Sequence, residues 1–548
     1  MVLSARMKIL LVAILFALGW FVNLQYRDLF QTDEGRYAEI PREMLASGNW
    51  VTPRLDGIKY FEKPVLQYWA TAAAYTLFGE HNWSARLWIA LTGFLGVLMT
   101  AWAAVRLFDR RTAWCAAAIL ASSIYYVIMG HFNTLDMGVS FFMCASLFAF
   151  LLAMQASDRQ DIRARRGWMY VAWAAAALGM LSKGLETVVL PGAVFVLYVL
   201  LTRDWRRFRE LHYYGGIVIF LLLAGPWYLL VSVRNPEFPH YFFIYEHFQR
   251  FLTPVAHRPG AWWYFIPILL LALAPWWPQF VRALARLFRR ESAAPGFNHA
   301  LFLWLWSIFI FVFFSYSDSK LASYILPIVP ALAILVGREL ALQRRGELLL
   351  SALLCLVVAL SGLWLAPLVH SDGGHVPLDL YKAFLPWLVA GSGLLLLFAI
   401  AAFAFAYFRR PATATGLMVV ALFAATQVVT SGAQALAPVY SGKFLAEQIA
   451  PYNQPGVPFY SIDSYQQSLP FYLKRTLTLV AYKGELAFGL GLEPQKWIPN
   501  IDTFIQRWQS DPRALAVMPT ATYALLMKKG VPMQVIGRDP ERVAVKKP

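Results

Sequence analysis

Long apolar segments alternate with short polar gaps along all 548 residues of this chain. Since about 20 apolar residues cross a bilayer as one helix, each long apolar segment predicts one crossing. The predicted crossings are 8–25, 84–105, 112–130, 136–155, 168–182, 185–202, 214–233, 261–281, 300–316, 321–337, 348–368, 383–407 and 414–437. The pattern therefore predicts a polytopic α-helical membrane protein with about thirteen transmembrane helices.

Arginine is concentrated in six of the polar gaps, which occur at every second position between the predicted helices. These gaps read "RLFDRR", "DRQDIRARR", "RDWRRFRE", "RALARLFRR", "RELALQRR" and "YFRR". Because basic loops stay on the cytoplasmic side, we expect them and the N-terminus to be cytoplasmic. An odd number of crossings then places the C-terminus outside, together with loops 26–83 and 234–260. Segment 65–80 is too short for a crossing and is interrupted by Gln67, so we expect a helix at the membrane interface.

The chain changes character near residue 440. From there, aromatic and β-branched runs with turn signals alternate with helix-like pieces such as "IDTFIQRWQ". Such alternation favours a small α/β domain. We therefore expect two domains, a transmembrane catalytic domain over 1–439 and an outer α/β domain over 440–548.

Composition agrees with a lipid bilayer as the main environment. The chain is 59% hydrophobic and only 14% charged, whereas a soluble protein is about 25% charged. The net charge of +17 would point to nucleic acid in a soluble protein, but here it resides in the gaps that orient membrane helices, so no nucleic-acid partner is expected. The cysteines lie inside apolar segments without metal spacing, which indicates core positions: Cys115, Cys144 and Cys355.

Polar side chains that could perform chemistry gather in the outward gaps. The densest stretch is 31–50, which includes "TDEGRYAEIPREM", and "YFEKP" follows in the same loop. The chain has no P-loop, no dinucleotide-binding glycine motif and no HExxH motif, which argues against an ATP-driven pump and a zinc protease. Ionisable residues are scarce within the apolar segments, which disfavours a coupled transporter. An enzyme at the outer membrane face is favoured, and a lipid flippase or transporter is the non-enzymatic alternative.

The motifs "DEGRYAEI", "YFEKP" and "SKLASYILPIVP" occur in the order seen in one family. Through them the chain resembles the bacterial lipid A 4-amino-4-deoxy-L-arabinose transferases. These belong to the GT-C type of membrane glycosyltransferases, which use polyprenyl-phosphate sugars and include protein O-mannosyltransferases. The resemblance implies transfer of that sugar from undecaprenyl phosphate to lipid A on the periplasmic side of the bacterial inner membrane. Mannose or galacturonic acid as the sugar, and protein as the acceptor, stay open as alternatives.

The resemblance also implies roles for particular residues. Asp33 would be the main catalytic carboxylate, and Asp136 in "HFNTLD" would be a second one. Contacts to the carrier phosphate would come from Lys63, Arg250 and Tyr324, and Lys320 would join them because it precedes Tyr324 by four residues, one helical turn. Four further residues are expected in the cavity: Glu34, Arg36, Tyr37 and Tyr60.

Each of these residues also has a structural alternative. Asp33 and Glu34 could cap a helix, Asp136 could begin the next helix, and Lys63 could extend to lipid headgroups. Arg250 could bind anionic lipid without specificity, and Lys183 with Glu186 could form a simple ion pair. No cofactor is predicted. A divalent metal stays an alternative through Glu62 and nearby histidines, although their spacing is loose: His240, His247 and His257.

Overall fold

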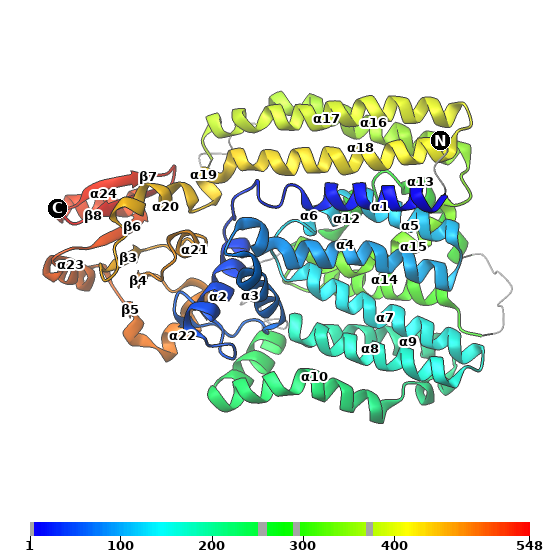
Figure 1. Ribbon diagram of the computed structural model, residues 1–548, viewed down its shortest axis with the longest axis horizontal. Coiled ribbons are helices and arrows are strands. Elements are labelled where there is room, and N and C mark those ends of the chain that lie inside the picture. The colour runs from blue at the N-terminus through cyan, green and yellow to red at the C-terminus, as the bar shows by residue number, and fades with distance from the viewer. Residues whose placement is uncertain (1–4, 250–259, 289–295, 369–375) are drawn as a thin grey trace.

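The computed structural model describes residues 5–249, 260–288, 296–368 and 376–548. A long helical bundle makes up most of the molecule, and a smaller unit of helices and strands lies at one end of it (Figure 1). The N-terminus lies toward the opposite end of the bundle, while the C-terminus lies in the smaller unit. The two termini are therefore separated along the long axis.

The helices of the bundle follow the apolar segments of the sequence. They are α1 (Ala5–Phe21), α4 (Asn82–Leu107), α5 (Arg110–Ser122), α6 (Ile124–Met129), α7 (Asp136–Asp158), α8 (Ile162–Ser182), α9 (Glu186–Thr202), α10 (Tyr213–Arg234), α12 (Phe265–Leu273), α13 (Trp277–Leu287), α14 (His299–Tyr316), the 3₁₀ helix η4 (Ala322–Ile328), α15 (Val329–Leu340), α16 (Arg345–Leu365), α17 (Leu378–Tyr407) and α18 (Pro411–Gly432). In the described ranges, eight helical spans are long and apolar enough to cross a membrane, or nine if the bent pair α12–α13 is one span. The chain is a multi-span membrane protein, as predicted.

Two of the predicted crossings are not single straight helices. Segment 261–281 divides into α12 and α13, which are bent by 110°, at a break that contains Pro275; proline lacks the N–H that would continue the helix. Segment 112–130 divides at Ser123, whose hydroxyl accepts a hydrogen bond from the Tyr126 N–H and so caps α6. The same hydroxyl donates to the Ala272 carbonyl at 2.7 Å. A hydrogen bond therefore joins the break within segment 112–130 to the end of α12, next to the break within segment 261–281.

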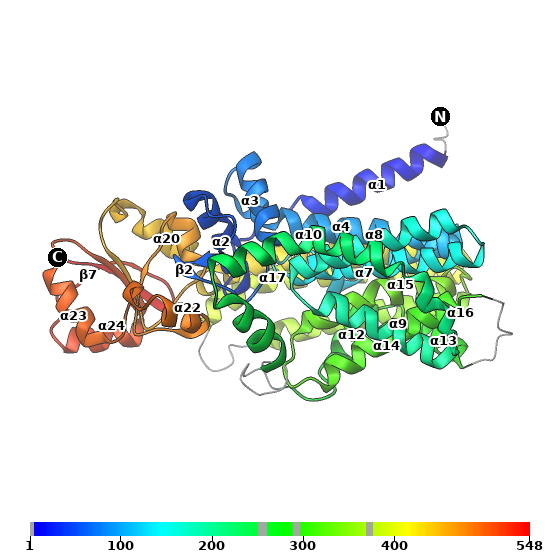
Figure 2. The same ribbon diagram turned by 90° about the horizontal axis from the view of Figure 1, so that it is seen from below.

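The loop after α1 builds a layer across the end of the bundle. It contains α2 (Asp33–Ser47), the short hairpin strands β1 (Arg54–Leu55) and β2 (Ile58–Lys59), and α3 (Leu66–Phe78). Helices α2 and α3 lie between the bundle and the C-terminal unit (Figures 1 and 2). The position of α3 across the bundle end, outside the parallel helices, agrees with the interfacial helix expected for segment 65–80.

A glycine lets α2 pack directly against the C-terminal unit. A Cβ atom at Gly35 would clash with the backbone of Gln467 and Ser468, just before the short helix α21 (Leu469–Leu473). The glycine of the "DEGR" motif therefore permits a close approach of backbone to backbone. This contact brings the C-terminal unit next to the polar residues on either side of Gly35.

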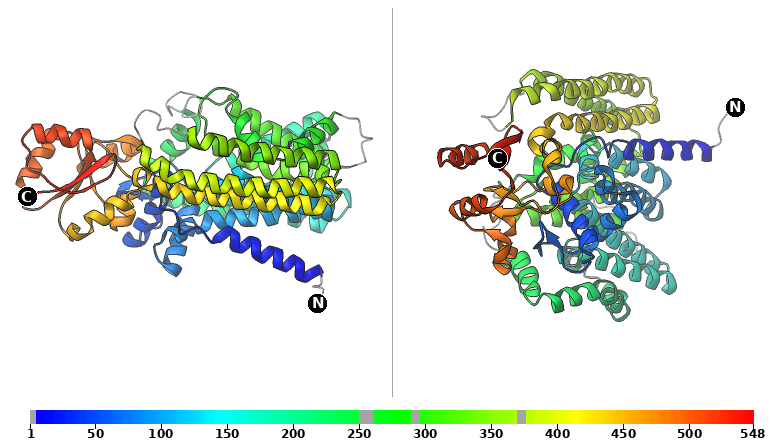
Figure 3. Two further views of the ribbon diagram at one scale, coloured as in Figure 1. Left: turned by 90° about the horizontal axis from the view of Figure 1, so that it is seen from above. Right: turned by 60° about the vertical axis from the view of Figure 1, so that its left-hand side comes forward.

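The C-terminal unit is a mixed α/β fold around a six-stranded sheet, visible edge-on in Figure 3. The strands are β3 (Phe459–Ile462), β4 (Thr478–Val480), β5 (Trp497–Ile498), β6 (Leu515–Pro519), β7 (Gln534–Arg538) and β8 (Arg542–Lys546). Their order is β5-β4-β3-β6-β8-β7; β5, β4, β3 and β6 are parallel, and β8 is antiparallel to β6 and β7. Its larger helices are α20 (Lys443–Ile449), α22 (Ala487–Leu492), α23 (Ile501–Ser510) and α24 (Thr520–Lys528). The small C-terminal α/β domain expected from the sequence is confirmed.

Candidate active site

A cavity of about 340 Å³ lies between the membrane helices and the layer that contains α2, the β1–β2 hairpin and α3. Its wall combines side chains from α2, the loop after β2, the start of α7, the turn between α8 and α9, η2 (His240–Gln249), the end of α14 and η4. The sequence had predicted several of these side chains for one site: Asp33, Arg36, Tyr37, Glu62, Lys63, Asp136 and Tyr324. The structure thus brings together residues from four separate parts of the chain.

The Arg36 guanidinium organises one side of the cavity. It lies 2.8 Å from Asp33 Oδ1 and 2.8 Å from Glu485 Oε2, and it donates to the Tyr60 hydroxyl at 2.7 Å. Burial would lower the pKa of Arg36, but the Tyr60 hydroxyl and the carboxylates of Glu485 and Asp33 raise it above its ordinary value. The Asp33 side chain remains 47% exposed, so its carboxylate is both oriented by Arg36 and accessible from the cavity.

A second charged group in the cavity wall lies at the first residue of α7. The Asp136 carboxylate pairs with the Lys183 ammonium at 2.5 Å, and Glu186 lies 3.5 Å from the same nitrogen. The ammonium also lies 4.8 Å from the centre of the Tyr324 ring, within range for a cation–π contact. Burial alone would lower the pKa of Lys183, but Asp136 and Glu186 raise it. Lys183 therefore stays charged and fixes the carboxylate of Asp136.

Lys63 provides a third charged position. Its ammonium lies 3.3 Å from Glu246 Oε2, and the Lys63 side chain is 20% exposed. The Lys63 ammonium lies at the end of a flexible side chain, so it can turn from this carboxylate toward a phosphate that enters the cavity. The ion pair is therefore compatible with an anion site that forms when the ligand arrives.

Much of the rest of the cavity lining is apolar. These side chains come from the start of α9, the end of α14 and the residue before η4: Leu185, Val189, Leu190, Phe313, Phe314 and Leu321. The cavity can therefore both solvate charge and contact a hydrocarbon chain. This combination fits a ligand with a charged head and a lipid tail.

Lys320 does not occupy the position that the sequence suggested. Helix η4 begins only at Ala322, so Lys320 and Tyr324 are not one turn apart on a common helix. The Lys320 ammonium donates to the carbonyl oxygens of Ser315 and Ser317 at 2.8 and 2.7 Å. The structure therefore corrects this prediction: Lys320 stabilises the C-terminal end of α14, where carbonyls lack helical partners.

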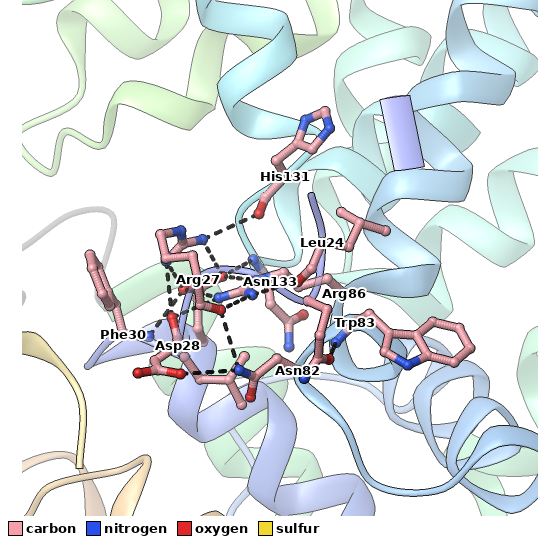
Figure 4. A network of polar contacts seen from close by, with 12 residues as sticks. Leu24, Arg27, Asp28, Phe30, Asn82, Trp83, Arg86, His131 and Asn133 are labelled. Carbon is pink, nitrogen blue, oxygen red and sulfur yellow. Dashed lines mark hydrogen bonds and ion pairs between the residues drawn. The ribbon is translucent and has the colours of Figure 1, made fainter. Parts of the chain in front are cut away.

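Glu34 also differs from its predicted place in the cavity. Its side chain is 1% exposed and is paired with Arg27 and Arg86, in a network that includes Asn133 (Figure 4). On a helix, neighbouring residues point in different directions, so Asp33 faces the cavity while Glu34 faces the protein interior. Tyr60 reaches the site through its bond to Arg36. Arg250 lies outside the described residues.

A metal site receives no further support from the described part of the chain. No group of three or more histidine, cysteine, aspartate or glutamate side chains there could hold a metal ion. Glu62 lines the cavity, 3.9 Å from Arg36. The side chains of His247 and His257 lie outside the described residues.

Lys183 and Glu186, which the sequence suggested as an ion pair in the outward turn "SKGLE", lie 3.5 Å apart in the wall of the cavity. The sequence did not identify two acidic residues that the structure brings to the site: Glu246 and Glu485. Glu485 belongs to the C-terminal unit and reaches Arg36 only through the packing of that unit on α2. Nothing in its local sequence indicates this contact.

The family profiles that match the chain agree with this architecture. A profile described as aminoarabinose transferase C-terminal domain matches residues 445–547, and one described as dolichyl-phosphate-mannose-protein mannosyltransferase matches residues 5–242. An Aeromonas salmonicida protein named undecaprenyl phosphate-alpha-4-amino-4-deoxy-L-arabinose arabinosyl transferase is 33% identical over 393 residues, which cover 69% of this chain and 70% of that protein. The chain belongs to the aminoarabinose transferase family. The resemblance found in the sequence is confirmed.

Other members of the aminoarabinose transferase family match to different extents. A protein of the same name from Erwinia tasmaniensis is 34% identical over 334 residues; the match covers 60% of this chain and 59% of that relative's length. The crystal structure of ArnT from Cupriavidus metallidurans bound to undecaprenyl phosphate is similar with a TM-score of 0.93 at 38% identity, over 99% of this chain and 98% of that one. The whole architecture, both bundle and C-terminal unit, is therefore shared within the family.

Proposed function

We propose that this protein transfers 4-amino-4-deoxy-L-arabinose from undecaprenyl phosphate to a phosphate group of lipid A. The observation that carries the proposal is the cavity, which is lined by a half-exposed carboxylate, Asp33, by a lysine, Lys63, and by apolar side chains of α9 and α14. The family supports the same activity, because its named members are arabinosyl transferases that act on an undecaprenyl phosphate sugar.

The carrier phosphate is proposed to bind between Lys63 and Tyr324, with Arg250 as a further contact. In the reaction, an oxygen of the acceptor phosphate attacks the anomeric carbon of the sugar. The bond between that carbon and the carrier phosphate breaks, and its electron pair leaves with the carrier. A cation beside the departing phosphate stabilises the negative charge that develops on it. Lys63 is suited to this role because its ammonium can leave Glu246 for the phosphate.

Asp33 is proposed to accept a proton from the acceptor, and Asp136 is proposed as the second catalytic carboxylate of the cavity. A phosphate monoester near neutral pH retains part of its second proton, and the Asp33 carboxylate can accept that proton as the oxygen attacks. A hydroxyl acceptor on a protein would need a stronger base. Arg36 holds the carboxylate at 2.8 Å, so its position is set before the substrates arrive.

The charges of the cavity favour an amino sugar. Its described lining contains three cations, namely Arg36, Lys63 and Lys183, and five carboxylates: Asp33, Glu62, Asp136, Glu186 and Glu246. A sugar with a protonated amine would compensate the excess of carboxylates, whereas galacturonic acid would add another negative charge. Mannose would be neutral in this respect. The excess of acids therefore supports aminoarabinose among the sugars considered.

We also propose the orientation of the protein in the bacterial inner membrane, with the N-terminus cytoplasmic and the C-terminus periplasmic. The arginine-rich connections α4–α5 and α17–α18 lie toward the bundle end where the N-terminus is found (Figure 1), in agreement with the positive-inside rule. The C-terminal α/β domain over 440–548 would then cover the cavity from the periplasm, and residues 1–439 would form the catalytic membrane domain.

The proposal is tested with purified protein in liposomes that contain undecaprenyl-phosphate aminoarabinose and lipid A. Mass spectrometry is expected to detect lipid A that carries the added amino sugar, and to detect none when galacturonic acid replaces aminoarabinose on the carrier. Movement of the donor across the bilayer without sugar transfer would favour a flippase. Transfer to envelope protein in place of lipid A would contradict the proposed acceptor.

A further inference from the structure

The carboxylate of Glu34 lies directly behind the cavity, in the protein interior. Its side chain is 1% exposed, although the preceding residue, Asp33, is 47% exposed at its side chain. Two arginines surround Glu34, Arg27 from the loop after α1 and Arg86 from α4. A buried charge of this kind is costly unless its partners are held in a good geometry, so its contacts define how the surrounding segments fit together.

Glu34 accepts six hydrogen bonds from four residues. Arg27 donates through Nη1 and Nη2 at 2.5 and 2.9 Å, and Arg86 donates through Nε and Nη2 at 2.8 and 3.0 Å. The backbone N–H groups of Phe30 and Asn133 donate at 3.0 and 3.1 Å. A carboxylate offers about four lone-pair directions, so both oxygens are fully used. No neutral side chain of the same size could accept all of these bonds.

Arg86 extends this network to the chain that leads into α2. Its Nη1 donates to the carbonyls of Leu24 and Arg27 at 2.8 and 2.5 Å, and its Nη2 donates to the Asp28 carbonyl at 2.8 Å. Figure 4 shows these carbonyls and guanidiniums converging from separate segments. The loop between α1 and α2 is therefore bound along its length to α4.

The contacts of Glu34 also join the two candidate catalytic carboxylates. Glu34 follows Asp33 at the start of α2, and its partner Asn133 lies three residues before Asp136 at the start of α7. We propose that Glu34 is a positioning residue that fixes Asp33 and Asp136 relative to one another across the cavity. This inference rests on the proposed function insofar as transfer requires both carboxylates. Glu34 itself touches neither the cavity nor its ligands.

The charge of Glu34 is essential to this arrangement. Burial would raise the pKa of its carboxyl, but Arg27 and Arg86 outweigh burial and lower that pKa below the ordinary value. Glu34 is therefore ionised throughout the physiological range. A glutamine in its place has one oxygen, and its NH₂ group would face the N–H donors of Arg27, Arg86 and Asn133. The loop before Asp136 and the start of α2 would then lose the contacts that they share through Glu34, and they would separate.

The test compares Glu34→Gln with Glu39→Gln in the full-length protein. Glu39 is the control because it also lies in α2, is 0% exposed at its side chain, and accepts hydrogen bonds from one arginine, Arg42. Three quantities are measured for each folded variant: kcat of sugar transfer, the Kd for undecaprenyl phosphate, and amide hydrogen exchange in peptides that cover 28–36 and 128–138. A purely structural role of Glu34 would lower the yield of folded protein but leave kcat unchanged in the molecules that fold.

For Glu34→Gln we expect the Asn133 and Phe30 amides to exchange at least about 10-fold faster, because both lose a bond to the carboxylate. We expect kcat to fall about 10²-fold, the size of effect that a displacement near 1 Å produces, with Kd for the carrier changed by no more than about twofold. Glu39→Gln should leave exchange in 128–138 unchanged and kcat within about threefold. Unchanged exchange at Asn133, or equal losses of kcat in both variants, would overturn the proposal.

A second variant covers the case in which Glu34→Gln does not fold. Arg86→Lys keeps the positive charge but cannot form the two parallel bonds to Glu34, so the same changes are expected at about 10-fold in kcat. A wild-type kcat and wild-type exchange at Asn133 in this variant would contradict the positioning role. Hydrogen exchange requires no sugar donor, so if the wild-type protein transfers no sugar, the proposed function fails while the exchange result still reports on Glu34.

Discussion

Buried acids join the hairpin after α2 to the C-terminal unit, and they predict an unusual dependence of stability on pH. Asp56 is 4% exposed, and its Oδ1 accepts the Leu477 N–H at 2.6 Å. Its other oxygen has no hydrogen-bond partner among the described residues. Burial raises the pKa of Asp56 to about 8. The neighbouring Glu43, which accepts the N–H groups of Asp56 and Gly57, has a pKa raised by burial to about 7.

The sign of the effect follows from proton binding in the two states. An unfolded aspartate has a pKa near 4, so between about pH 4 and pH 8 the folded protein holds a proton on Asp56 that the unfolded chain has released. The free energy of unfolding therefore falls as pH rises, by about 1.4 kcal/mol per pH unit for each such proton. From pH 5.5 to pH 8, a carboxyl with a pKa of about 8 contributes a loss of about 3 kcal/mol.

Asp56→Asn removes this proton exchange and keeps an oxygen that can accept the Leu477 N–H. We expect the wild-type protein to lose thermal stability between pH 5.5 and pH 8, and the variant to lose clearly less. The assay is thermal unfolding in detergent at constant ionic strength, followed by tryptophan fluorescence. The control is Asp502→Asn, because Asp502 lies in the C-terminal unit that Asp56 contacts and its side chain is 80% exposed; the pH profile of this variant should match the wild type. A wild-type stability that rises over this range, or an equal fall in Asp56→Asn, would refute the reasoning.

Three further predictions concern the cavity and the orientation. Lys63→Met should weaken binding of undecaprenyl phosphate at least about 10-fold, since it removes a cation proposed to contact the phosphate; unchanged affinity in a binding titration would contradict this role. Glu485→Gln should lower kcat about 10-fold with carrier affinity kept, because it loosens the ion pair of 2.8 Å with Arg36 that helps to orient the cavity; a wild-type kcat would argue against it. In intact spheroplasts, an impermeant thiol reagent should label Asp502→Cys but not Arg206→Cys, whose positions are 80% and 89% exposed at the side chain; the reverse pattern would invert the proposed orientation.

The sequence was sufficient for the helical architecture because hydrophobicity acts locally. Each predicted apolar segment contains helix, and the small α/β unit begins where the composition changes. The breaks within 112–130 and 261–281 were missed because continuous hydrophobicity concealed them. Pro275 could have indicated the break within 261–281. The break at Ser123 can be recognised only from the structure, through the hydrogen bond between Ser123 and Ala272.

The site was predicted to a smaller extent, since much of it depends on tertiary contacts. Motifs identified Asp33, Lys63 and Tyr324, which all line the cavity. The direction of Glu34 could not be deduced, because its partner Arg86 lies 52 residues further along the chain. Glu485 reaches the site only when the C-terminal unit packs on α2. Residues far apart in sequence can be assigned to a site by a motif, but their partners emerge only from the fold.

The most direct test of the proposed mechanism separates the chemical step from carrier binding in Asp33→Asn. Purified protein is mixed with a limiting amount of undecaprenyl-phosphate aminoarabinose and excess lipid A, and a single turnover is followed by mass spectrometry, with the Kd for undecaprenyl phosphate measured in parallel. A positioned acid–base carboxylate contributes about 10²- to 10⁴-fold in rate, and Asp33 is held 2.8 Å from Arg36 beside the cavity. For Asp33→Asn we expect a loss of the single-turnover rate within that range and a Kd within about twofold of the wild type. A single-turnover rate close to that of the wild-type protein, at equal folding, would contradict the assignment of Asp33.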